Sequence, residues 1–93
     1  MDDQDLRNAV VRKLLRKNVL GNHKKQVDTV VGWAAPTHAR GRCRQLIDDM
    51  VSDQDAPIEQ YGGGQRENIR LTSADAAVAY LKANDGDVPF GWD

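Results

Sequence analysis

The chain has 93 residues, of which 40% are hydrophobic and 29% are charged, and its formal net charge is −1. This length suits one domain with a modest core, and the regular recurrence of apolar residues argues against disorder. The acidic start and the absence of a long apolar run argue against a secretory signal and against a membrane span of roughly 18 residues. Because Cys43 is the only cysteine, no internal disulfide can form, and we expect a cytoplasmic protein without membrane contact.

The small net charge hides a strong segregation of charge along the chain. Residues 6–45 hold ten basic side chains and one acid, Asp28, whereas residues 46–93 hold ten acids and three bases. A basic segment beside an acidic remainder predicts a positive face for an anionic partner. Chance clustering of charge on solvated helix faces is the alternative explanation.

The first predicted element is a helix over about residues 3–18. Leu6, Val10 and Leu14 recur at helical spacing. Acids at its start and bases near its end suit the helix dipole. We expect Gly21 to end it.

A second, shorter helix is predicted over about residues 23–34, with Asn22 as its N-cap. This prediction places Lys24 and Lys25 in the first helical turn, where the helix dipole disfavours cations. The two lysines are therefore either ligands for an external anion or exposed residues of little consequence.

A third helix is predicted over residues 37–52, after a break at Pro36. Its apolar residues share one side: Ala39, Cys43, Leu46, Ile47 and Met50. The opposite side is polar and is flanked by Arg42 and Arg44; it holds Thr37, His38, Gly41, Gln45 and Asp48.

Two short strands follow, at residues 58–61 and around Ile69 and Leu71, joined by a glycine-rich loop that we expect to protrude. The last predicted helix begins at Thr72 or Ser73, where Thr72-Ser73-Ala74-Asp75 fits a capping box, and ends at residues 84–86. In the tail, Phe90 and Trp92 either fold back onto the core or meet a partner.

This order of helices and hairpin resembles the winged helix-turn-helix superfamily of prokaryotic DNA-binding proteins. The resemblance covers residues 6–84 and is carried by residues 24–51, the loop at residues 62–64 and Arg70-Leu71-Thr72. It implies an α+β winged helix domain over residues 1–86, with a three-helix bundle, a wing of two or three strands and a C-terminal helix. Residues 87–93 form a tail.

The resemblance also implies a function, namely sequence-specific binding of double-stranded DNA by a transcriptional regulator. The helix at residues 37–52 would enter the major groove, and the wing at residues 61–67 would lie at the backbone or the minor groove. Many such regulators are dimers, so a homodimer is a possible assembly.

The residue types on the polar side of the third helix agree with this function. Arg42, Arg44 and Gln45 can bind base edges, and Gly41 permits a close approach of the backbone. At the wing, Arg66 can reach a phosphate or the minor groove. The candidate DNA-binding residues are Lys24, Lys25, Thr37, His38, Arg40, Gly41, Arg42, Arg44, Gln45 and Arg66.

Other functions find less support in the residues. His23, His38 and Cys43 are the strong transition-metal ligands, and the last two lie on different sides of one helix. No catalytic triad or carboxylate pair stands out, and the glycine run lacks the lysine of a phosphate loop. We therefore expect neither catalysis nor a cofactor.

The main alternative is a winged helix module that binds protein rather than DNA, because Asp48 and Asp49 at the end of the third helix would repel phosphate. RNA binding is a third option, weakened by the small number of aromatic residues available for stacking on bases.

Overall fold

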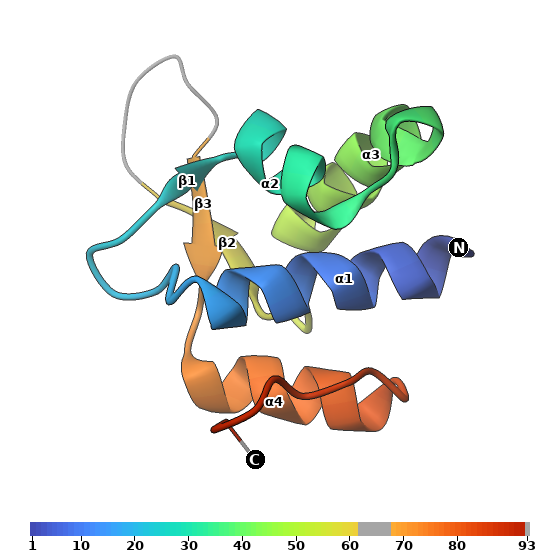
Figure 1. Ribbon diagram of the computed structural model, residues 1–93. Coiled ribbons are helices and arrows are strands. Elements are labelled where there is room, and N and C mark those ends of the chain that lie inside the picture. Colours follow the sequence, from blue (N-terminus) through green and yellow to red (C-terminus); the bar gives the residue numbers. More distant parts are fainter. Residues whose placement is uncertain (62–67, 93) are drawn as a thin grey trace.

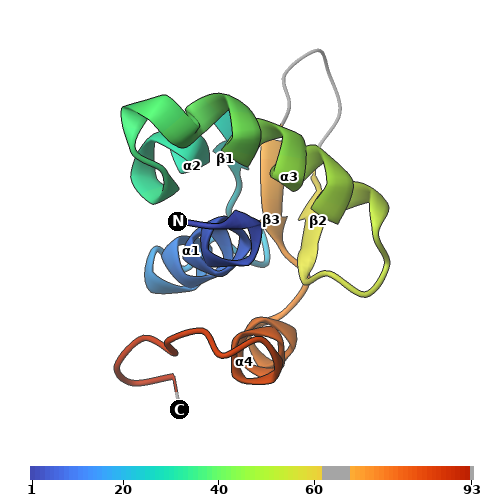
Figure 2. The same cartoon turned by 90° about the vertical axis from the view of Figure 1, so that its right-hand side faces the viewer.

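The computed structural model describes residues 1–61 and 68–92, and this part of the chain is an α+β fold of four α-helices and a small three-stranded antiparallel sheet. Helix α1 lies between α2 and α3 on one side and α4 on the other, and the sheet packs at one end (Figures 1 and 2). The elements in chain order are α1 (Asp3–Arg16), β1 (Lys25–Gln26), α2 (Val27–Ala34), the 3-10 turn η1 (Thr37–Ala39), α3 (Arg40–Ser52), β2 (Ile58–Gln60), β3 (Asn68–Leu71) and α4 (Ala74–Ala83).

The core is apolar and contains side chains from all four α-helices and from the sheet. Each fully buried large aliphatic side chain contributes about 1.5–3 kcal/mol relative to its exposed state. The largest of these side chains in the described residues are Leu14, Leu15, Leu46, Ile47, Ile58, Ile69, Leu71 and Leu81. The helical periodicity of the sequence predicted this burial for α1 and α3. None of the helices in the described part of the chain combines the length and apolar character needed to cross a bilayer.

Helix α1 ends two residues before its predicted limit, and Asn18 rather than Gly21 ends it. Asn18 has a positive φ of 54° and its N–H donates to the carbonyl of Leu15 at 3.1 Å. The N–H of Val19 donates to the carbonyl of Leu14 at 2.9 Å. This is the Schellman arrangement, in which asparagine tolerates the left-handed position that glycine usually fills.

The predicted start of the second helix is wrong. Lys25 and Gln26 form strand β1, and α2 begins at Val27 after Gln26, which makes no side-chain cap. Lys25 pairs with Ile69 in β3, so pairing with a distant strand overrides the local helical pattern. Lys24 and Lys25 therefore do not oppose a helix dipole.

The third helix agrees with the prediction except in its first turn. Residues Thr37–Ala39 form a 3-10 turn, and the α-helix proper runs Arg40–Ser52. The predicted inner side is buried at Cys43, Leu46 and Ile47, each 0% exposed. Burial raises the pKa of the Cys43 thiol, so the group is protonated and unreactive at neutral pH.

Strands β2 and β3 pair antiparallel, with Ile58 opposite Leu71, and β3 is the central strand between β1 and β2. The sheet therefore has three strands. The loop predicted to form the wing tip, together with Arg66, lies outside the described residues.

Helix α4 begins after Ser73, whose hydroxyl accepts from the N–H of Ala76 at 3.0 Å, so the capping box predicted from Thr72 does not form. Two side-chain amides of α1 donate hydrogen bonds to α4 and its C-cap residue. Asn8 Nδ2 donates to the carbonyl of Asn84 at 3.0 Å, and Gln4 Nε2 donates to the hydroxyl of Tyr80 at 3.2 Å. These bonds position α4 against α1 on the side away from α3 (Figure 2).

Candidate nucleic-acid interface

The outer side of η1 and α3 carries most of the predicted site residues. The nine candidates within residues 1–61 and 68–92 are all exposed, namely Lys24, Lys25, Thr37, His38, Arg40, Gly41, Arg42, Arg44 and Gln45. Seven of them therefore lie on two consecutive elements, two on η1 and five on α3, whereas Lys24 and Lys25 lie at the edge of the sheet. The tenth candidate, Arg66, is outside the described residues.

Charge changes sign along α3. Arg40, Arg42 and Arg44 lie in its first half, and Asp48 and Asp49 lie exposed in its second half. The partial positive charge of a helix N-terminus adds to the basic half. An anion is therefore attracted to the beginning of α3 and repelled from its end.

Arg42 is held by two side chains. Its Nε and its terminal nitrogen donate to the two carboxylate oxygens of Asp3 at 3.0 and 2.6 Å, and its other terminal nitrogen donates to Gln45 at 3.1 Å. The hydrogen bond from Arg42 lowers the pKa of Asp3, and the same bond raises the pKa of Arg42. The pair joins the start of α1 to the first half of α3.

Arg44 forms a second ion pair, with Asp28 in the first turn of α2. The Arg44 side chain is 45% exposed and the Asp28 side chain 70% exposed. Exposed ion pairs of this kind are weak and are screened by salt. A phosphate can therefore replace either carboxylate. The two ion pairs direct Arg42 toward α1 and Arg44 toward α2, so the two arginines flank the outer side of α3.

Removing these carboxylates should strengthen the binding of an anion at α3. We expect Asp28→Asn to raise affinity for duplex DNA about two- to fivefold at low salt, because Arg44 no longer has a competing partner. Asp75→Asn is a matched control, since Asp75 is also the second residue of its helix but lies on α4. Fluorescence anisotropy of a labelled duplex measures both, and equal effects of the two substitutions would contradict a role for Arg44.

Gly41 leaves open space on this surface. A Cβ built at Gly41 or at Gly32 has no atom within 4 Å, and both glycines are exposed on helices. Alanine at either position should therefore stabilise the fold by about 0.5–1 kcal/mol, because glycine loses more backbone entropy on folding.

The two substitutions should differ in binding. If a duplex backbone or base edge approaches α3 closely at Gly41, then Gly41→Ala should weaken affinity about fivefold or more, as an overpacked contact does. Gly32→Ala on α2 should leave affinity unchanged. Thermal unfolding and duplex anisotropy together check this, and unchanged affinity in Gly41→Ala would rule out the close approach.

A cluster of cationic and aromatic side chains at the base of the hairpin was not predicted from the sequence. The guanidinium of Arg70 lies 3.7 Å from the centre of the Tyr61 ring and donates to Glu59 at 2.8 Å, and it also donates to the carbonyl of Gly21. Lys24 Nζ lies 6.0 Å from the same ring. The cluster holds Lys24 beside the hairpin, and the signal available in sequence was only the alternation around Arg70.

A small open hollow lies beside α3 and the sheet. It has a volume of about 240 Å³ and is lined by polar and apolar residues, namely Val27, Asp48, Val51, Ser52, Gln60 and Ile69. The Asp48 carboxylate places negative charge at this hollow, beside the second half of α3.

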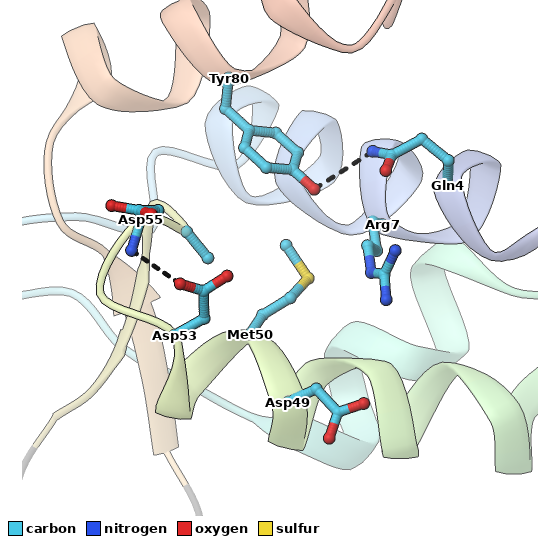
Figure 3. Close-up of a pocket in the computed structure, with 8 residues that line it drawn as sticks. Gln4, Arg7, Asp49, Met50, Asp53, Asp55 and Tyr80 are labelled. Atoms are coloured by element: carbon cyan, nitrogen blue, oxygen red, sulfur yellow. Dashed lines mark hydrogen bonds between the residues drawn. The ribbon is translucent and has the colours of Figure 1, made fainter.

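The second half of α3 also borders another hollow, of about 280 Å³, between α1, α3 and α4 (Figure 3). Three carboxylates line it, those of Asp49, Asp53 and Asp55, with the guanidinium of Arg7 and the hydrogen-bonded pair Tyr80 and Gln4 across from them. These three carboxylates make the region around the end of α3 negatively charged, so the cationic surface ends near the middle of the helix.

Among residues 1–61 and 68–92, no three His, Cys, Asp or Glu side chains gather closely enough to hold a metal ion. Comparisons of the chain with protein-family models, with curated proteins and with solved structures each found no match.

Proposed function

We propose that this chain is a winged helix domain that binds double-stranded DNA and regulates transcription. The observation that carries the proposal is the outer side of α3, where three arginines, a glutamine and a glycine are exposed together on the first half of one helix. Arginine and glutamine are the side chains that bind guanine and adenine edges bidentately.

The arrangement of the helices and strands supports the same proposal. Helix α3 follows α2 after a short break, and the hairpin of β2 and β3 comes next, with β1 completing the sheet at β3. Two helices joined by a short turn, with the second facing outward, suit a major groove about 12 Å wide. The fold is compatible with a winged helix.

In this proposal, the residues of the surface make different contacts with the duplex. Arg42, Arg44 and Gln45 exchange their contacts within the chain for base edges or phosphates, and Gly41 lets the duplex come close. Lys24 and Lys25 lie at the sheet edge and contact phosphates on the flank. The wing predicted over residues 61–67 would lie at the backbone or the minor groove, and its residues 62–67 are outside the described part of the chain.

The test is the salt dependence of duplex binding. At about 50 mM salt we expect a dissociation constant in the micromolar range for random genomic duplex, because phosphate contacts supply nonspecific affinity. The logarithm of the affinity should fall linearly with the logarithm of salt, with a slope that counts the phosphates contacted. Absence of binding at tens of micromolar protein, or a flat salt response, would remove the proposal.

One observation favours a second candidate, a winged helix module that binds protein. Arg42 and Arg44 already have carboxylate partners within the chain. Asp48 and Asp49 lie exposed further along the same helix. A partner with mixed charge would suit this surface. Measuring the mass of the particle in solution, with and without duplex, separates a DNA complex from a homodimer or a protein assembly.

A further inference from the structure

A hollow on the far side of α1 from α3 combines two cations with one exposed and one half-buried aromatic ring. It encloses about 330 Å³ and is lined by Arg12, Arg16, Pro89, Phe90 and Trp92. The tail turns back from the end of α4 and runs beside that helix, beneath α1 (Figures 1 and 2). Two segments from opposite ends of the chain therefore form one recess.

The arginines of this hollow have no carboxylate partner in the described part of the chain. Within residues 1–61 and 68–92, the three ion pairs leave out both Arg12 and Arg16, which lie four residues apart and so on one side of α1. The Nε of Arg12 is buried and donates to no acceptor. A buried donor left without an acceptor is unfavourable and is rare in native proteins. Within the described residues neither guanidinium group is paired with a carboxylate, so both can pair with an anion.

The aromatic residues point to the rest of the ligand. Phe90 is fully exposed, at 104%, although it is large and apolar, while the neighbouring Trp92 is half-buried against the core. An exposed ring beside a cationic recess offers a stacking surface for another planar ring. The volume lies at the lower end of the roughly 300–1,000 Å³ of small-molecule sites.

We propose that this hollow binds a small phosphate monoester that carries a planar ring, with the phosphate on Arg12 and Arg16 and the ring stacked on Phe90. A phosphate monoester carries a charge of about −1.5 to −2 near neutral pH and has three acceptor oxygens, which suits two guanidinium forks better than a single carboxylate does. The site is separate from the α3 surface, because α1 lies between them.

Isothermal titration calorimetry of the full chain with adenosine monophosphate tests the proposal. We expect a dissociation constant at or below about 1 mM, with inorganic phosphate at least about tenfold weaker because it cannot stack. Adenosine, which has no phosphate, should give no heat. A second readout is quenching of Trp92 fluorescence in Trp33→Phe, where Trp92 is the remaining tryptophan.

Variants locate the binding. Arg12→Gln with Arg16→Gln should weaken the nucleotide about tenfold or more, whereas Lys13→Gln with Lys82→Gln, which removes the same charge, should not. Phe90→Ala should weaken the nucleotide and leave inorganic phosphate unchanged. Arg42→Ala with Arg44→Ala should leave nucleotide binding intact, which separates this site from the DNA surface.

Several results would overturn the proposal. These are no heat with millimolar adenosine monophosphate, equal binding of adenosine, or undiminished nucleotide binding after loss of Arg12 and Arg16. Equal affinity for inorganic phosphate and the nucleotide would overturn the assignment of a planar ligand.

Discussion

Replacing Arg42 and Arg44 together with alanine should weaken duplex binding about thirtyfold or more, since each bidentate contact to a base or phosphate makes a large contribution to affinity. The substitution should leave the melting temperature nearly unchanged, because both arginines are about half exposed and their ion pairs are screened by solvent. Anisotropy of a labelled duplex at low salt, together with thermal unfolding, measures the two effects on the same samples.

The control for this variant removes equal charge from the opposite side of the protein. Arg16→Ala with Lys82→Ala takes two cations from the side formed by α1, α4 and the tail. If that control weakens duplex binding as much as loss of Arg42 and Arg44, then net charge and not the α3 surface explains the affinity. A variant of Arg42 and Arg44 that binds duplex like the parent would exclude α3 as the interface.

Leu46→Ala should destabilise the fold by about 2–5 kcal/mol, a large part of the stability of a domain of this size. Leu46 is 0% exposed on the inner side of α3, where the helix packs on α1 and α2. Truncation leaves a cavity that the surrounding aliphatic side chains fill only in part. Urea unfolding followed by circular dichroism measures the loss.

A neighbouring exposed residue provides the comparison for Leu46. Gln45→Ala changes the adjacent position of α3 and should shift stability by no more than about 0.5 kcal/mol, because surface substitutions seldom do more. Similar losses in the two variants would mean that α3 is not held against α1 and α2 through its inner side.

The helices of the three-helix core could be predicted because their apolar spacing is local. Leu6, Val10 and Leu14 recur at helical spacing, and they are buried as that spacing requires. The polar side of α3 followed from the same periodicity. Its burial pattern, with Gly41 and Gln45 exposed opposite Cys43, is the part of the candidate site that the sequence predicted correctly.

The features that the sequence did not predict depend on contacts between distant segments. Strand β1 exists because Lys25 pairs with Ile69, which no local pattern around Lys25 indicates. The ion pair of Arg42 with Asp3 joins residues far apart in the chain. Asp28 offered a weak signal, as the one acid in the basic segment, and it proved to be the partner of Arg44.

The placement of a duplex on the first half of α3 can be measured directly by nuclear magnetic resonance of the isotope-labelled protein during titration with duplex DNA. Amide shifts should change most at residues 37–45 and at Lys24 and Lys25, and little in α4 or in residues 87–92. Changes concentrated in α4 and the tail, with residues 37–45 unaffected, would contradict the proposed interface.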